Sequence, residues 1–349
     1  MIYFKEKNKE SFYQSPVSFD KYTPREILQY AIGANMYIPA TKKGIVNKII
    51  NSDLGEVGSI TLCCEDAVSD NSVKEAENNI ISMMEELDIH FSNSVEIIKN
   101  MPLIFIRVRN VEQFKNLSAK MNKKYLRFIA GFVFPKFSSL NGKEYLLILD
   151  KLSKDFDEVL YGMPILEGEE LIYKEHRFKE LDLISMILSE YHEYILNVRV
   201  GGTDFSSRFG LRRSANRSIY DIRVVSDCLI DILNFFLRME RSYVVSGPVW
   251  EYFSEDEQSI EVVGLKNEIE LDIENGFYGK TIIHPTQIKY VNERYIVKFE
   301  EYQDAVNILN AEGGVFKGAN NNRMNEVKPH TSWAKKILNR ALIFGVLNK

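Results

Sequence analysis

Seven polar side chains with the potential for chemistry follow short apolar runs of the sequence. They are Glu65, Asp66, Arg107, Lys136, Glu167, Asp204 and Ser246. Carboxylates can hold metal ions or transfer protons, and arginine and lysine can bind anions. If the apolar runs are strands of one parallel barrel, the residues that follow them gather at a single mouth, where barrel enzymes carry out their chemistry. The sequence therefore predicts one cavity that these side chains share.

Eight apolar runs have the composition of short strands that are buried on both faces. In chain order they read "MYIPATKK", "SITLCCEDAV", "PLIFIRVRN", "GFVFPKF", "YGMPILEG", "ILNVRVGGTDF", "SYVVSGPVW" and "GKTIIHPTQ". Longer stretches between them carry apolar residues at three- and four-residue spacing, as helical crossovers between parallel strands require. This alternation predicts an α/β fold, namely a (β/α)8 TIM barrel with a helical C-terminal extension.

The chain divides into three predicted segments. Residues 1–34 are a polar lead-in that ends in a helix, residues 35–287 are the catalytic barrel, and residues 288–349 are the helical extension. A polar loop rich in glycine and asparagine, residues 315–330, joins the two helical parts of the extension. Because the last helix has a broad apolar face, we expect the extension to contact a neighbouring subunit.

The composition is that of an ordinary soluble globular protein, with 45% hydrophobic and 27% charged residues. The net charge of −5 argues against a nucleic acid or an anionic membrane as a partner, and the first residues lack the apolar stretch of a signal peptide. Cys63, Cys64 and Cys228 are too few for a disulfide framework and indicate buried thiols in a reducing compartment. We therefore expect a cytoplasmic protein that binds a small molecule.

Glu167 and Asp204 each end an apolar run beside a glycine. Two carboxylates from neighbouring strands, completed by waters and substrate oxygens, form a natural Mg²⁺ site. An equally good alternative is that both acids cap the helices that follow. Gly202 and Thr203 directly precede Asp204, and we expect them to bind substrate because glycine lets a ligand approach the backbone closely.

Arg107 closes an apolar strand and requires an anionic partner there. A substrate carboxylate held by two hydrogen bonds fits, and so does a buried pair with Glu65 or Asp66. Arg109 lies two residues on and points the same way if the strand continues, so either arginine could be the clamp. Lys136 follows the same logic with less specificity.

Six motifs, taken in order, resemble the citrate lyase beta subunit and malyl-CoA lyase group of the HpcH/HpaI aldolase superfamily. They read "CCEDAV", "IRVRN", "PKF", "PILEG", "GGTDF" and "GFYGKTIIHPTQI". The resemblance covers the chain from about residue 35 to its end. The segments "SGPVWEYF" and "NRMNEVKPHTSWAKKIL" are similar to a branch of barrel-fold carbon–carbon bond lyases linked to tellurium-resistance gene clusters.

The resemblance implies a role for each charged residue of the predicted mouth. Glu167 and Asp204 match the metal-ligating acids of the group, and Arg107 matches its substrate-carboxylate arginine. Glu65 and Asp66 match acids that hold metal-bound waters.

Two further positions are implied to take part in catalysis. Lys136 matches a lysine close to the metal site. Glu326 stands where the group often has a catalytic aspartate donated by the neighbouring subunit, which implies a homo-oligomer, most simply a trimer.

We therefore expect a magnesium-dependent carbon–carbon lyase or aldolase that acts on a 2-oxo acid or its thioester or phosphorylated adduct. One alternative keeps the site but uses a phosphorylated sugar or nucleotide-derived substrate, bound by Arg208, Arg212, Arg213 and Arg217. A second alternative is a catalytically silent barrel that serves as a binding module, since fold alone does not establish activity.

Overall fold

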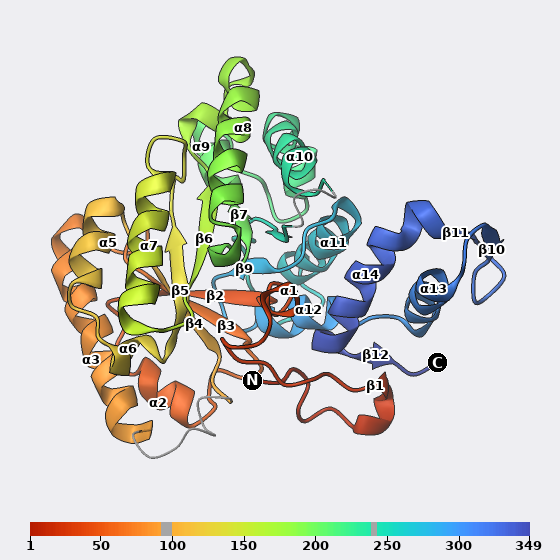
Figure 1. The fold of residues 1–349 in the computed structure, drawn as a ribbon, viewed down its shortest axis with the longest axis horizontal. Helices are drawn as coiled ribbons and strands as arrows, with labels where there is room; N and C mark the ends of the chain where they lie inside the picture. The colour runs from red at the N-terminus through yellow and green to blue at the C-terminus, as the bar shows by residue number, and fades with distance from the viewer. Residues whose placement is uncertain (92–99, 239–242) are drawn as a thin grey trace.

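A barrel of eight parallel strands forms the centre of the computed structural model, which describes residues 1–91, 100–238 and 243–349 (Figure 1). The strand order is β8-β7-β6-β5-β4-β3-β2-β9, and a parallel bridge between Gly247 and Lys280 joins the two ends. The strands are β2 (Ala34–Pro39), β3 (Ser59–Cys63), β4 (Leu103–Arg107), β5 (Ile129–Phe134), β6 (Tyr161–Leu166), β7 (Val198–Val200), β8 (Val245–Ser246) and β9 (Lys280–Ile282). Each predicted apolar run overlaps one of these strands, so the predicted barrel is confirmed.

Helices connect the strands on the outside of the barrel (Figure 1). They are α2 (Ile45–Ile50), α3 (Val73–Phe91), α5 (Val111–Ser118), α6 (Lys123–Leu126), α7 (Gly142–Phe156), α8 (Lys174–Glu190), α9 (Gly202–Arg208), α10 (Arg223–Phe236), α11 (Ile260–Asn275) and α12 (Gln287–Arg294). Helix α11 is capped at its C-terminus by Gly276, whose φ of 100° suits glycine best. Short 3₁₀ turns are η1 (Lys9–Ser11), η2 (Asp70–Ser72), η3 (Glu169–Leu171), η4 (His192–Tyr194) and η5 (Ile219–Asp221).

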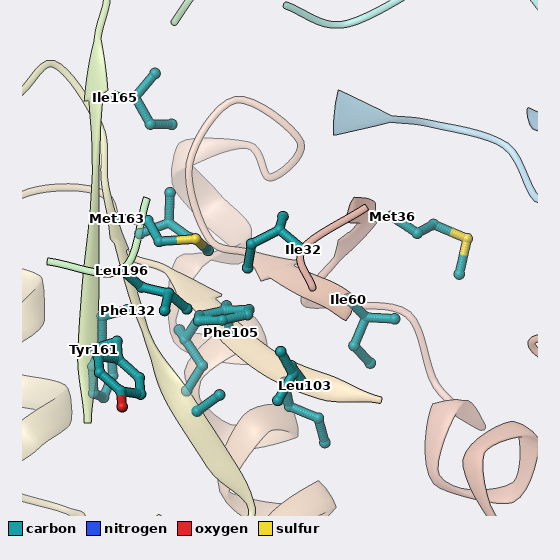
Figure 2. Close-up of a cluster of buried hydrophobic side chains, with 14 of the residues drawn as sticks. Ile32, Met36, Ile60, Leu103, Phe105, Phe132, Tyr161, Met163, Ile165 and Leu196 are labelled. Atoms are coloured by element: carbon teal, nitrogen blue, oxygen red, sulfur yellow. The ribbon is translucent and has the colours of Figure 1, made fainter. Parts of the chain in front are cut away.

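Apolar side chains fill the barrel below its mouth (Figure 2). On β4, Phe105 is fully buried and shares a strand face with Arg107, because side chains two residues apart point the same way. On β6, Met163 and Ile165 likewise precede Glu167. The alternation that points apolar side chains of β4 and β6 into the core therefore also places a charged residue where each of these two strands reaches the mouth of the barrel.

The first 34 residues, predicted as a polar lead-in, contribute several buried side chains to the core. Tyr3 is fully buried, donates a hydrogen bond to the Ala31 carbonyl at 2.8 Å and stacks on Phe344 with ring centroids 4.6 Å apart. Strand β1 (Phe12–Gln14) pairs antiparallel with β12 (Val346–Leu347), and α1 (Arg25–Leu28) packs on the last helix. Several aromatic side chains of this segment pack into the core, although the average composition of the segment is polar.

The extension folds onto its own chain. It consists of α13 (Phe299–Asn310), a hairpin of β10 (Val315–Lys317) and β11 (Met324–Glu326), and α14 (Val327–Phe344). The hairpin replaces part of the predicted loop, with Val315 paired to Glu326 and Lys317 to Met324. Buried Asp304 holds its turn by accepting hydrogen bonds from Ala319 N at 2.7 Å and Arg323 Nε at 2.6 Å.

The apolar face of α14 is largely buried within the chain. Ala334, Ile337, Ala341, Ile343 and Phe344 are at most 2% exposed. Packing on α13, α1 and the N-terminal residues covers this face, so it no longer supplies a reason to expect a partner. In the described part of the chain, no helix combines the length and the apolar character needed to span a membrane.

Candidate active site

A cavity of about 370 Å³ lies at the carboxyl ends of the barrel strands. Its lining residues come from β2, β4, β6, β7 and β9, from the segments that follow β3, β6, β7, β8 and β9, and from α9. They are Tyr37, Asp66, Arg107, Ile165, Glu167, Arg199, Val200, Gly201, Gly202, Thr203, Asp204, Ser207, Val249, Thr281 and Ile283. The structure thus brings most of the predicted site residues to one cavity, as parallel strands with a common polarity require.

Arg107 is the centre of a buried ion cluster in this cavity. Its Nη2 lies 2.7 Å from Glu65 Oε2, 3.1 Å from Asp66 Oδ2 and 3.1 Å from Glu167 Oε1. Both neighbouring acids reach the arginine because β3 ends at Cys63, so the strict alternation of a strand no longer separates them. Arg107 Nη1 contacts only Cys63 Sγ, at 4.0 Å, and Nε has no partner among the described residues.

Lys136 ties β5 to the same cluster through its backbone and its side chain. It adopts a left-handed φ of 47°, which is uncommon outside glycine. In this conformation its backbone N donates to Glu167 Oε1 at 3.1 Å, and its Nζ lies 2.6 Å from Glu65 Oε1. The turn after β5 therefore orients Glu167 and compensates part of the charge of Glu65.

Glu167 and Asp204 lie side by side against Gly201. A Cβ atom at Gly201 would fall 2.3 Å from Glu167 Cβ and 3.2 Å from Asp204 Oδ2, so only glycine fits between the two carboxylates. Gly168 and Gly201 occupy the N-cap positions of η3 and α9, and the alternative that Glu167 and Asp204 serve as helix caps is wrong.

The buried carboxylates hold protons more tightly than exposed ones. Burial, together with the nearby Asp204, raises the pKa of Glu167 to about 8, although Arg107 opposes the shift. Burial also raises the pKa of Asp204, with a further contribution from the charge of Asp66. For Asp66, burial is outweighed by the hydrogen bond with Glu65 and the charges of Arg107 and Lys136, so its pKa is lowered. The raised pKa values of Glu167 and Asp204 thus come mainly from burial, with a smaller contribution from the neighbouring acids.

The charge balance and the ligand atoms of the cluster fit a bound divalent cation. Two cations, Arg107 and Lys136, face four carboxylates, an excess of two negative charges when all are ionised. Over residues 1–91, 100–238 and 243–349, no group of three or more His, Cys, Asp and Glu side chains is arranged to hold a metal by itself. That agrees with Mg²⁺, which binds one or two carboxylates and keeps waters or substrate oxygens for the rest.

Two residues predicted at the site, Arg109 and Ser246, lie elsewhere, whereas Glu326 was predicted for the mouth of a neighbouring subunit. Arg109 turns away to an ion pair with Asp70. Ser246 was expected in the shared cavity, and that is wrong, because its Oγ donates instead to the Tyr278 carbonyl at 3.0 Å. Glu326 lies at the end of the β10–β11 hairpin, on the side of the molecule remote from α3 and α5 (Figure 1).

The four arginines that follow Asp204 do not act as one cluster. Arg213 is buried in an ion pair with Glu268, and Arg208 pairs with Glu169 at 3.1 Å. Arg212 and Arg217 remain at the surface. This scattering gives no support to the phosphorylated-substrate alternative.

Sequence reasoning missed Arg199, which lies inside the barrel and lines the cavity. Its Nη2 donates to Thr281 Oγ1 at 2.6 Å, and its guanidinium lies over the ring of Tyr37, 5.7 Å from the centroid. A detectable signal was present, because Arg199 is a lone charge between Val198 and Val200 in an otherwise apolar strand. The argument made for Arg107, that an arginine in an apolar strand requires an anionic partner, also applies to Arg199.

A closed parallel barrel with buried charges at its C-terminal mouth is the architecture of a TIM-barrel enzyme. Residues 26–346 match the model of the family described as "C-C_Bond_Lyase of the TIM-Barrel fold". The chain belongs to this family of carbon–carbon bond lyases.

Solved structures share this fold at low sequence identity. A citrate lyase from Burkholderia xenovorans LB400 aligns with a TM-score of 0.66 and 16% identity, covering 93% of each chain. Protein CitE from Mycobacterium tuberculosis, in complex with magnesium, acetoacetate and coenzyme A, aligns with a TM-score of 0.54 and 18% identity, covering 90% of this chain and 99% of its own. Haloferax volcanii malate synthase, a lead(II) complex, aligns with a TM-score of 0.54 and 12% identity over 75% of this chain and 72% of its own. The comparison with curated proteins found no match.

Proposed function

We propose that this protein is a magnesium-dependent lyase or aldolase that breaks or forms a carbon–carbon bond next to a 2-oxo acid. The observation that carries the proposal is the excess of buried carboxylates beside Arg107 in a cavity at the barrel mouth. The family supports it, and so does the structure of M. tuberculosis CitE, which is a complex with magnesium and a keto acid, acetoacetate.

In this proposal Glu167 and Asp204 hold Mg²⁺, and Glu65 and Asp66 orient waters around it. When bound, the ion would act as a Lewis acid toward the keto group of the substrate. The backbone of Gly202 and Thr203 would lie against the substrate, as their positions in the cavity lining allow.

Arg107 would bind the carboxylate of the 2-oxo acid. Its Nη2 already serves the acids, whereas Nη1 has only a sulfur contact and Nε has no partner within the described residues. Nη1 can donate to a carboxylate in the cavity, and the guanidinium would stabilise the negative charge that develops as the carbon–carbon bond breaks. Lys136 would assist by keeping Glu65 and Glu167 in place.

We further propose that Glu326 is the general acid or base and that it serves the mouth of a neighbouring copy. The hairpin that carries it stands away from the barrel of its own chain and exposes Val315 and Met324 (Figure 1). Closed cyclic symmetry would give each mouth one donated hairpin, and the resemblance to the citrate lyase group favours a trimer. Buried, unpaired cysteines within the described chain support a cytoplasmic enzyme.

Calorimetric titration with Mg²⁺ and pyruvate tests the site. Wild type should bind Mg²⁺, and pyruvate binding should require it. Glu167→Gln and Asp204→Asn should lose both, whereas Glu169→Gln, which changes an acid exposed just beyond Glu167, should lose neither. Unchanged Mg²⁺ affinity in both Glu167→Gln and Asp204→Asn would contradict the proposed Mg²⁺ site.

Mixing variants tests the shared site. Hybrid oligomers of Glu167→Gln and Glu326→Gln chains should recover part of the activity that each variant lacks, because some mouths then combine two intact halves. A monomeric protein by light scattering, or no recovery despite demonstrated exchange of chains, contradicts the donation of Glu326.

A further inference from the structure

We propose that Arg199 binds a second anionic group of the substrate, so that the site accepts a 2-oxo acid bearing an additional carboxylate or phosphate-like group. This inference rests on the proposed function and defines the substrate class more narrowly. It comes from the surroundings of one buried side chain.

Arg199 lies in the barrel interior, 2% exposed, at the wall of the cavity. Its hydrogen bond to Thr281 uses Nη2 alone. Nε and Nη1 are buried and have no hydrogen-bond partner among the described residues. A guanidinium has five N–H donors in a fixed plane, so most of its hydrogen-bonding capacity is unused.

The other buried cations show how unusual this is. The buried lysines and arginines of the described chain are Lys21, Arg25, Arg107, Arg177, Arg199, Arg213, Lys280 and Arg340. Seven of them have a carboxylate oxygen within 4 Å, and among the described residues Arg199 alone has none. A buried, unpaired charge is costly, and folding normally provides a counter-ion.

The missing counter-ion can come from the cavity. Thr281 and Tyr37, the two residues that contact the Arg199 guanidinium, both line it. The ring of Tyr37 is close to both guanidiniums, with Arg107 5.9 Å and Arg199 5.7 Å from its centroid. One ligand could therefore place an anionic group at each arginine. Since the acids beside Arg107 leave Arg199 uncompensated, a ligand with two anionic groups matches the cavity better than one with a single group.

Three 2-oxo acids with the same skeleton test this inference. 2-Oxobutyrate, oxaloacetate and 3-phosphonopyruvate differ only in a methyl, carboxylate or phosphonate group on C3. In calorimetry with saturating Mg²⁺, wild type should bind one or both of the dianionic ligands at least about tenfold more tightly than 2-oxobutyrate, as a charge-assisted hydrogen bond allows. The ligand with the gain identifies the second group as carboxylate or phosphate-like.

Arg199→Met should bind all three ligands with the affinity that wild type has for 2-oxobutyrate. Arg199→Lys should keep part of the preference, and Arg208→Met, a control at an exposed arginine near the mouth, should keep all of it. In the absence of ligand, the melting temperature of Arg199→Met should equal or exceed that of wild type, because the variant no longer buries an unpaired charge.

Equal binding of the three ligands by wild type would overturn this inference and leave the proposed function intact. A preference that survives in Arg199→Met, together with a lower melting temperature, would assign Arg199 a structural role and also overturn it. Failure of all three ligands, including 2-oxobutyrate, to bind with Mg²⁺ would reject the proposed function together with this inference.

Discussion

Two buried ion clusters of this protein differ in charge balance. The outer network, formed by Lys280, Arg213, Glu268 and Asp272, lies between β9 and α11 on the outside of the barrel. Lys280 Nζ is 3.0 Å from Glu268 Oε1 and 2.6 Å from Asp272 Oδ2, and Arg213 pairs with the same glutamate. Tyr220 Oη donates to Asp272 at 2.7 Å. Arg213 also pairs with Glu251 at 3.2 Å. Two buried cations thus meet two fully buried carboxylates and a third that is partly exposed.

The mouth cluster, formed by Arg107, Lys136, Glu65, Asp66, Glu167 and Asp204, has two cations for four carboxylates and opens onto a cavity. The side chains of Lys280, Glu268 and Asp272 are 0% exposed, so no ligand can reach them and the outer network can contribute only to folding. An unbalanced cluster keeps an unfavourable electrostatic energy until a ligand binds. The difference separates a structural element from a binding site without reference to sequence motifs.

Lys280→Met should produce the largest loss of stability. It would leave Glu268 and Asp272 buried without their cation, and we expect a loss of about 3–5 kcal/mol in the free energy of unfolding. Mg²⁺ affinity of the folded protein should not change. Denaturant titration measures the first and calorimetry the second. Lys289→Met, which removes an exposed pair with Glu257, should leave the free energy of unfolding nearly unchanged. Equal effects of the two substitutions would contradict the structural role of the outer network.

Glu167→Gln should have the opposite effect to Lys280→Met, with weaker Mg²⁺ binding and no loss of stability. We expect Mg²⁺ affinity to fall by about 100-fold or more, because the variant loses a direct ligand, while unfolding stability stays equal or rises, since a desolvated carboxylate is replaced by a neutral amide. Calorimetry and thermal unfolding on one preparation give both values. A destabilised variant with normal Mg²⁺ affinity would show that Glu167 stabilises the fold and does not bind Mg²⁺.

Arg107→Lys should weaken Mg²⁺-dependent pyruvate binding by about tenfold, because lysine keeps the charge but cannot present two parallel donors. The matched control is Arg109→Lys, two residues away, where the guanidinium faces Asp70 instead of the cavity. Its pyruvate affinity should be that of wild type. The reverse result would show that Arg109 is the clamp.

The pH dependence of Mg²⁺ binding should show the smallest effect. Because the pKa of Glu167 is raised to about 8, the metal-free carboxyl is mostly protonated at pH 7 and must lose its proton to bind Mg²⁺. Affinity should therefore rise with pH, by about threefold between pH 7.5 and 8.5. Titrations in two buffers of different ionisation enthalpy should reveal the proton released. An affinity that is flat over this range, with no proton release, would exclude Glu167 as the titrating ligand.

The sequence by itself determined the barrel and most of its mouth. Strand composition and helical spacing are local properties, and the polarity of parallel strands then places Arg107, Glu167 and Asp204 at one end whatever the details of packing. The stop of α11 at Gly276 is equally local, since it depends on the backbone freedom of a single residue.

Only the tertiary structure decided which charges meet. The end of β3 at Cys63 lets Glu65 and Asp66 both reach Arg107. The packing of α11 buried Arg213. The pairing of Arg199 with Thr281, from strands far apart in the sequence, left a buried cation without an acid. Each outcome depends on where a strand ends or on which distant side chain packs against the charged residue. Packing across the whole barrel sets these contacts, whereas neighbours in the chain do not.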